Sequence, residues 1–349
     1  MDKSAADAFV YAKASGMLAK SFIGPRASRL FSATSLQELW ALVFQNEIPA
    51  MPEVLLAKKI EQEAEARFIS DYISLLQNYS RPAKVLTEVL HFYDYDNLKD
   101  IAASLCLAKI SGESAKLPLL ADIGQYSMLN YKAWPDVAGI TAGSPLAWYD
   151  KVPEFNEQQE LDSRLDLQYV RALWESVMKV PSSIRGVVSS LIQEEMILNN
   201  IIWAIRLRVY YGMTKEQVIP ELMTLKDCKT FRQIKDDPLA FPAVRTLDWD
   251  VGSYADWAGW KYSSLLNPNE EGVVWQIDPR WVQQKAKTMF NKKALGQFHR
   301  HPFSVNVLVT WFKIKQFELD CIRTAAEGLR LNVEQGKVQE FAGVVAAQA

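Results

Sequence analysis

The run Asn199-Asn200-Ile201-Ile202-Trp203-Ala204-Ile205-Arg206-Leu207 decides the fold, because a polar pair opens an otherwise apolar helical stretch. The same pattern occurs twice more, as Asp96-Asn97-Leu98 and as Asp320-Cys321-Ile322. In each copy an aliphatic residue and an apolar helix follow the polar pair. The copies lie farther apart than the roughly 20–50 residues of a solenoid repeat. The pattern therefore predicts three copies of a small helical subdomain joined into one body.

Helix signals surround all three copies. Apolar spacing and helix-breaking residues predict long helices at 4–21, 36–46, 53–79, 83–110, 157–180, 184–211, 279–295 and 303–331. Ser35 with Glu38, and Thr214 with Gln217, fit the capping box at helix starts. The runs 273–275 and 305–309 are rich in β-formers but abut helical patterns. The chain is therefore predicted to be all-α, without a sheet.

The repeat also predicts the domain organisation. We place the three subdomains at residues 1–122, 123–224 and 225–349, with irregular stretches rich in proline and glycine between the helical units. The inner helices at 90–110, 187–211 and 305–330 should be more buried than the helices before them, because their apolar character is more continuous.

Composition excludes several classes of protein. The 349 residues are 49% hydrophobic and 23% charged, so the chain can bury a large core. A net charge of −2 gives no global attraction to nucleic acid. No run approaches the roughly 18 apolar residues of a membrane span. Cys106, Cys228 and Cys321 lack the spacing of a disulfide or zinc site, which predicts a reduced, cytosolic protein.

Catalytic signatures are missing from the sequence. There is no phosphate-binding Gly-x-x-x-x-Gly-Lys loop, no His-Glu-x-x-His and no Gly-x-Ser-x-Gly. His299 and His301 flank Arg300, which would repel a cation, so we interpret them as loop histidines. We therefore predict no catalytic residue, no metal site and no cofactor.

Two clusters leave alternatives open. Asp94, Asp96 and Asp100 could bind a divalent ion, but a helix start near His91 is the favoured interpretation, since carboxylates are stabilising at helix N-termini. Five tryptophans fall between positions 249 and 281. Core packing is the first interpretation for them, a protein interface the second, and a stacking platform for sugars or bases the third.

The polar residues of the repeated helices have a structural and a functional interpretation. Asn97, Asn200 and Cys321 could mark contact surfaces, but interior hydrogen bonding is favoured because buried polar groups are normally satisfied. Arg206 lies about 240° around the helix from Asn200, so the two cannot form one site. We expect Arg206 to pair with an acidic residue of another helix.

A basic stretch near the C-terminus is a candidate interface. It consists of Arg280, Lys285, Lys287, Lys292 and Lys293. A solvated helix face is the commoner explanation for such a stretch. The alternative is that it faces acidic partner residues or anionic lipid headgroups.

In its three repeated helical motifs the chain resembles the C subunits of the V-type and A-type ATP synthases, a family related to the d subunits of the eukaryotic vacuolar ATPases. The second copy matches the family motif best, through Asn200, Ile201 and Arg206. The first copy matches at Asn97 and Leu98, with Ala103 where arginine is usual. In the third copy Cys321 replaces the usual asparagine and Leu329 the usual lysine, and the matching residues are Glu318, Ile322, Arg323, Thr324 and Gly328.

The resemblance implies a non-catalytic rotor subunit of the central stalk. Such a protein has three helical subdomains in a pseudo-three-fold, funnel-shaped arrangement. It would sit on the cytoplasmic end of the membrane proteolipid ring, receive the shaft subunits and pass torque that drives ion transport. Isolated, it should be a monomer. Two other classes stay open: a freestanding helical adaptor, or an α-helical enzyme with an aromatic-lined pocket and Asp94/Asp96 or Asp236/Asp237 as its carboxylates.

Overall fold

The structure, a computed structural model, describes residues 2–228 and 231–344. Those residues form helices joined by turns and irregular segments, with no strand among them. The all-α prediction is therefore confirmed. Of the two β-rich runs, 273–275 is irregular, and 306–309 begins a long helix.

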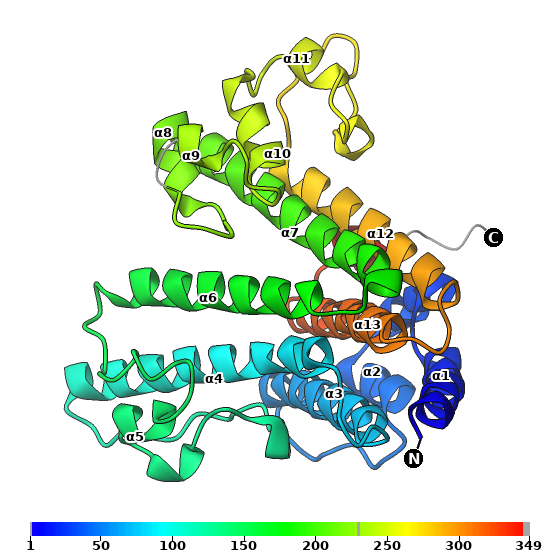
Figure 1. The fold of residues 1–349 in the computed structure, drawn as a ribbon. Helices are drawn as coiled ribbons and strands as arrows, with labels where there is room; N and C mark the ends of the chain where they lie inside the picture. The colour runs from blue at the N-terminus through cyan, green and yellow to red at the C-terminus, as the bar shows by residue number, and fades with distance from the viewer. Residues whose placement is uncertain (1, 229–230, 345–349) are drawn as a thin grey trace. The chain divides into compact units, whose positions relative to one another are not determined.

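The helices follow one another in chain order (Figure 1). The α-helices are α1 (Lys3–Lys20), α2 (Leu36–Val43), α3 (Glu53–Leu76), α4 (Lys84–Ser111), α5 (Val137–Thr141), α6 (Gln158–Met178), α7 (Ser182–Tyr211), α8 (Lys215–Val218), α9 (Phe231–Ile234), α10 (Phe241–Val244), α11 (Tyr254–Ala258), α12 (Pro279–Phe298), α13 (Asn306–Arg330) and α14 (Gln335–Phe341). The 3-10 helices are η1 (Gly24–Ser32), η2 (Gly124–Tyr126), η3 (Tyr131–Ala133), η4 (Ile219–Glu221), η5 (Arg245–Asp248) and η6 (Ser263–Leu265).

Capping explains where two of these helices begin. At α8 the full box forms, because the Thr214 side chain accepts from the backbone and Gln217 accepts from the Thr214 N–H at 2.9 Å. At α2 only half of it forms. Ser35 Oγ accepts from the Glu38 N–H at 3.2 Å, but the Glu38 carboxylate accepts from the N–H of Thr34 at 2.8 Å instead of that of Ser35.

Two compact units account for the packing. The first holds residues 2–6 and 65–181, where α4 packs along α6. The second holds residues 7–64 and 182–344, where α12 packs against both α7 and α13 and lies beside α7 in Figure 1. In this unit α13 also contacts α2, η1 and α14. The division into three subdomains at residues 122 and 224, and their three-fold arrangement, stay predictions.

The inner helices are the more buried members of their pairs, as predicted. Every residue from Asn306 to Ile314 of α13 is buried, whereas most buried positions of α12 are separated by two or more residues that are not buried. The apolar positions of α7 are likewise more continuously buried than those of α6. The repeated motifs of α7 and α13 therefore lie on helices that are packed against other elements along much of their length.

Candidate functional site

Asn97 fastens the segment that follows α4 to that helix. Its Nδ2 donates to the carbonyl of Ala121 at 2.8 Å and to the Tyr131 hydroxyl at 2.8 Å. Its Oδ1 accepts from the N–H of Ala121 at 2.8 Å. Both backbone polar groups of Ala121 are therefore satisfied by one buried amide. This arrangement confirms interior hydrogen bonding at Asn97.

Asp94 holds a second part of the same segment. Its carboxylate accepts from Ser127 Oγ at 2.6 Å, from the Met128 N–H at 2.8 Å and from the Tyr131 hydroxyl at 2.9 Å. The predicted helix start near His91 is wrong, because α4 continues unbroken through this region. Burial raises the pKa of Asp94, although its three donors act in the opposite direction. The carboxylate therefore serves as an internal acceptor on a continuous helix.

Asn200 of α7 repeats the arrangement seen at Asn97. Its Nδ2 donates to the carbonyls of Met223 at 2.9 Å and Leu239 at 3.0 Å, and its Oδ1 accepts from the Met223 N–H at 2.9 Å. Asp237 completes the attachment by accepting from the N–H groups of Leu225 at 2.7 Å and Leu239 at 2.9 Å. We call each pair of an asparagine and the backbone it holds an amide clamp.

The third copy has no amide clamp. Cys321 is fully buried, and burial raises the pKa of its thiol well above the usual range. The polar contact of this copy comes one turn earlier, where the buried Glu318 carboxylate accepts from the N–H of Phe22 at 2.5 Å and pairs with Lys315. The segment that follows α13 instead packs onto that helix through α14. The structure thus places Cys321 in the core.

The aliphatic residues of the motif are core residues. Leu98 and Ile201 are completely buried, and Ile322 is nearly so. They stand directly after the polar residue in each copy. Their role in the family pattern is therefore packing.

Arg206 does not have the acidic partner that the sequence suggested. It is half-buried, and its Nη2 donates to the side-chain oxygen of Gln283 on α12. Its Nε is buried and has no hydrogen-bond partner. The expectation of an acidic partner failed because an amide oxygen can take one guanidinium hydrogen bond without supplying a charge.

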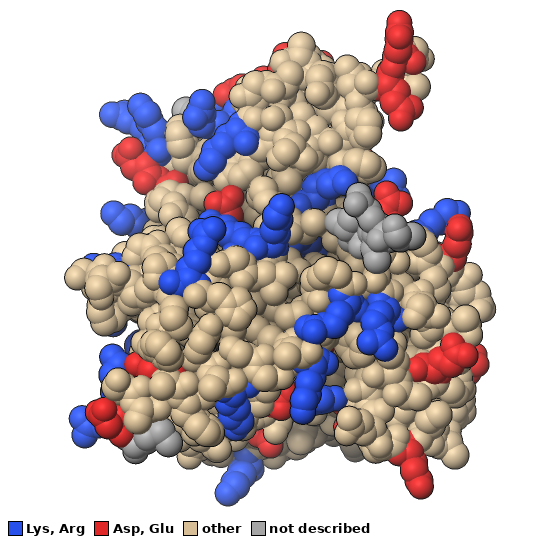
Figure 2. Space-filling view, turned by 90° about the vertical axis from the view of Figure 1, so that its right-hand side faces the viewer, with Lys and Arg blue, Asp and Glu red and all other residues tan. Residues whose placement is uncertain are grey.

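The basic stretch contains two partly buried lysines with partners on neighbouring helices and three exposed residues. Lys287 pairs with Asp320 at 3.4 Å, and Lys293 donates to the carbonyl of Ser190 at 2.8 Å, so both tie α12 to a neighbouring helix. The exposed members are Arg280, Lys285 and Lys292, with Lys285 lying 4.7 Å from the centre of the Trp281 ring. On the face shown in Figure 2, lysine and arginine side chains are spread among uncharged surface.

A cluster of charges also links α4 to α6 in the first unit. Lys99 pairs with Asp166 and lies 3.6 Å from Asp96. Burial raises the pKa of Asp162, the nearby charges of Asp166 and Asp100 add to that effect, and Lys99 opposes it. Asp162 Oδ1 is buried without a hydrogen-bond partner. No group of three metal-ligating side chains occurs in the described residues, so the cluster is one of carboxylates around a single lysine.

The family assignment follows from a comparison with known proteins. A family model described as ATP synthase (C/AC39) subunit matches residues 8–341. The chain belongs to this family. An uncharacterized protein of Treponema pallidum (strain Nichols) is 29% identical over 346 residues, which cover 99% of each chain. As a C/AC39 subunit, this protein is an accessory subunit of a V/A-type ATPase.

Most of the tryptophans between positions 249 and 281 of this C/AC39 subunit are packed in or against its core. Trp257 is completely buried, and its ring meets those of Trp249 and Trp260 edge-on at 5.1 and 5.4 Å between centroids. Trp275 is also buried. The core interpretation is therefore confirmed for Trp257, Trp260 and Trp275, and the partly buried Trp249 packs against this cluster.

The histidines of the α12–α13 connection are loop residues. His299 Nδ1 lies 2.9 Å from the Tyr11 hydroxyl, and the same tyrosine ring contacts Phe303. Phe303 has a φ of 59°, a left-handed conformation that residues other than glycine rarely adopt. The connection is thus fixed to α1 by aromatic contacts.

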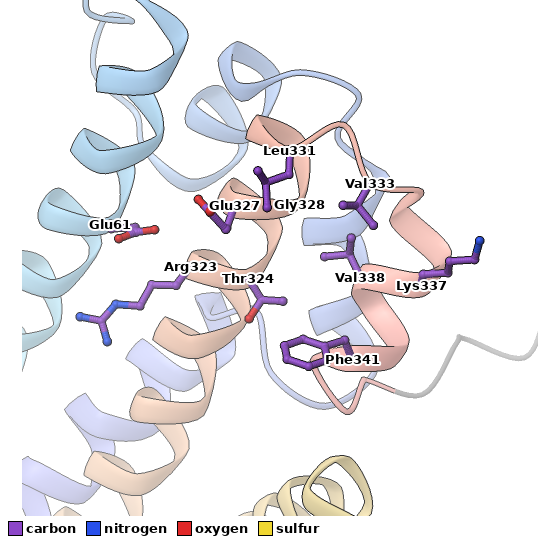
Figure 3. Close-up of a pocket in the computed structure, with 10 residues that line it drawn as sticks. All are labelled: Glu61, Arg323, Thr324, Glu327, Gly328, Leu331, Val333, Lys337, Val338 and Phe341. Atoms are coloured by element: carbon purple, nitrogen blue, oxygen red, sulfur yellow. The ribbon is translucent and has the colours of Figure 1, made fainter. Parts of the chain in front are cut away.

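One cavity of the C/AC39 subunit lies between α13 and α14 (Figure 3). It measures about 510 Å³ and is mostly apolar, with Leu331, Val333, Val338 and Phe341 along it. Arg323 and Glu61 line its polar end, and Lys337 points away from it in Figure 3. Three family-signature residues line this cavity: Arg323, Thr324 and Gly328. The lining holds no pair of aspartates, and in the described chain no helix is long and apolar enough to cross a membrane.

Proposed function

We propose that this protein is a non-catalytic central-stalk subunit that connects the shaft of a V/A-type ATPase to the membrane proteolipid ring. The observation that carries the proposal is the family match over residues 8–341. The subunit would turn with the shaft and transmit torque for ion transport. It would be held at the cytoplasmic face of the membrane by its partners.

The packing of the helices supports a mechanical role. Long segments that would otherwise be free to move are fastened to α4 and α7 by the amide clamps. The ion pair between the buried Lys313 and the partly buried Glu195, at 2.8 Å, ties α13 to α7. A part that transmits force needs such internal attachments more than it needs a reactive group.

The enzyme alternative receives no support from these side chains. Asp94 and Asp237, one from each candidate carboxylate pair, are both occupied by backbone and hydroxyl donors. The aromatic residues expected to line a ligand pocket are in the core. We propose that the isolated chain binds no nucleotide and hydrolyses none.

The test is to purify the complex from membranes through a tag on this chain. The shaft and proteolipid subunits should co-purify with the wild-type chain. Membranes lacking the chain should lose ATP-driven ion transport, and purified chain should restore it. Failure of the shaft and ring to co-purify would refute the proposal.

A covalent link distinguishes a rotor subunit from a stationary one. Cysteines introduced on this chain and on a shaft subunit should cross-link without stopping ATP-driven transport, since the two parts turn together. A cross-link from this chain to a stationary subunit should stop transport. The opposite pair of results would show that the chain does not turn with the shaft.

A further inference from the structure

We propose that the exposed face of α7 docks an acidic helix of a partner ATPase subunit, with Arg206 receiving a carboxylate. The face consists of Asn199, Trp203, Arg206 and Tyr210, and we call it the α7 face. The inference deepens the proposed function, on which it rests for the identity of the complex. It adds the chemistry of the partner and the residue that recognises it.

The four side chains form a single line along the helix. Their spacing of four, three and four residues keeps them on one side over about 16 Å of helix axis. Trp203 is 39% exposed and Tyr210 is 52% exposed. Single exposed hydrophobic residues are normal on a protein surface, but an aligned set of aromatic and arginine side chains is not a random scatter.

The α7 face continues a packed face of the same helix. About two and three turns toward the N-terminus from Asn199, on the same side of α7, Ile192 and Val188 are completely buried. Nearby, Glu195 pairs with Lys313 of α13. The side of the helix that is packed within this chain is therefore open from Asn199 onward. A helix laid along it would extend packing that the fold already uses.

The charge at Arg206 selects the partner. Its guanidinium is half-buried, bonded to the neutral Gln283, and forms no ion pair in the described chain. A partly desolvated cation without a counter-ion is costly, and a carboxylate from a partner would supply one. Arg280, 72% exposed, lies one turn from Gln283 on the same side of α12 and is 3.6 Å from Asp278. A basic partner would meet the uncompensated charge of Arg206 there, so the occupant is acidic.

The residue types fit a protein partner. Tryptophan, tyrosine and arginine are the side chains most enriched among residues that dominate binding energy at protein interfaces. A guanidinium can bond a carboxylate through two parallel hydrogen bonds, which fixes orientation as well as charge. Trp203 and Tyr210 stand on either side of Arg206 and would shield that contact from water.

Photo-cross-linking in the purified complex tests which molecule covers the face. p-Benzoylphenylalanine replaces Trp203 or, separately, Tyr210, and the cross-linked peptide is identified by mass spectrometry. The expected product is a glutamate- or aspartate-rich helical peptide of another ATPase subunit. A product with a second copy of this chain or with lipid, or no product at either position, would overturn the proposal.

Charge reversal tests the role assigned to Arg206. We expect Arg206→Glu to weaken retention of the cross-linked subunit by about tenfold or more. Changing the partner's carboxylate to arginine should restore it. Arg232→Glu, at another exposed arginine of the same unit, is the matched control and should retain the subunit normally. Equal retention by Arg206→Glu and the wild type would overturn the proposal.

Two further measurements keep the test decisive. If Arg206→Glu melts at a lower temperature than the wild type, the double variant Trp203→Ala/Tyr210→Ala takes its place, because both side chains are exposed. Unchanged retention by that double variant would also refute the inference. If the α7-face variants assemble normally while the wild type still co-purifies with shaft and ring, only this inference fails. If the wild type itself does not co-purify, the proposed function fails.

Discussion

Asn97 in α4 and Asn200 in α7 make the same set of hydrogen bonds to a residue more than twenty positions further along the chain. Each accepts from one backbone N–H and donates to the carbonyl of the same residue, which is Ala121 in one case and Met223 in the other. The remaining N–H of each amide donates to a second group, which is the Tyr131 hydroxyl for Asn97 and the Leu239 carbonyl for Asn200. The two copies are therefore related by mechanism as well as by sequence.

The amide clamp at Asn200 should be important for stability. Asn200→Ala leaves the N–H and carbonyl of Met223 without partners in a buried site, at a cost of roughly 2–4 kcal/mol. Urea unfolding followed by circular dichroism measures the change. Asn199→Ala, at the neighbouring exposed position, should alter the unfolding free energy by less than about 0.5 kcal/mol. Equal effects at the two positions would contradict the clamp.

Asp162 should make the first unit less stable as the pH rises. Its pKa is raised in the folded state, chiefly by burial, so the folded chain holds this proton more tightly than the unfolded chain. The stability it contributes is present below about pH 4, its unfolded pKa, and is lost as the pH rises through the folded value. Asp162→Asn should therefore raise the melting temperature at pH 7 more than at pH 4.5.

The matched control for Asp162 is Asp166, which is the ion-pair partner of Lys99. Asp166→Asn should lower the melting temperature at pH 7, because it removes the counter-ion. Should both variants move the melting temperature in the same direction, the destabilising effect assigned to the buried charge of Asp162 would be wrong.

Lys292 and Lys293 are adjacent in sequence but should respond differently to charge reversal. Lys293→Glu would place a carboxylate beside Glu194 and leave the Ser190 carbonyl without its donor, lowering stability by about 1–3 kcal/mol. Lys292→Glu is exposed and should leave the melting temperature nearly unchanged. If the exposed basic residues form an interface, Lys292→Glu should weaken assembly most at low salt. Assembly that is unchanged at every salt concentration would count against that interface.

Gly328 should be required for the docking of α14. A Cβ at this position would lie 2.7 Å from Cγ1 and Cγ2 of Val338, so Gly328→Ala should cost about 1–3 kcal/mol through overpacking. Shortening the opposing side chain with Val338→Ala should recover part of that loss. A double-mutant cycle by thermal melting measures the coupling. Additive effects of the two substitutions would show that they do not meet.

Arg206 should matter less for folding than the sequence suggested. Because its partner Gln283 is neutral, Arg206→Ala strands no charge and should cost about 1 kcal/mol. Thermal melting of the isolated chain would reveal the difference. A loss of several kcal/mol would indicate that a buried carboxylate depends on this arginine after all.

Local signals predicted the helices well because helix starts and ends depend on nearby residues. Thr214 and Gln217 identified α8 through a bond pattern that spans three residues. Gly212, with a φ of 61°, marks the end of α7. The helix start proposed near His91 failed for the opposite reason. Asp94 binds Met128 and Tyr131, more than thirty residues away, and no local pattern reveals a distant partner.

Side-chain partners across helices were the least predictable part of the site. The sequence indicated that Asn97 and Asn200 are buried acceptors and donors, but it could not show which backbone they hold. Lys292 and Lys293 look alike in a basic run, and only the position of α7 beside α12 distinguishes the exposed side chain from the paired one. The α7 face was not predicted from the sequence, because its exposure depends on where neighbouring helices end.

The amide clamps also bear on how the protein yields under load. An asparagine that holds both the donor and the acceptor of one residue must lose all of those bonds at the same displacement, so the attachment resists sliding until it breaks as a whole. A segment held in this way should resist shear and then detach abruptly, when its hydrogen bonds break together. By contrast, α13 has no amide clamp at Cys321. The segment that follows α13 is held by the packing of α14, so we expect it to detach gradually under force.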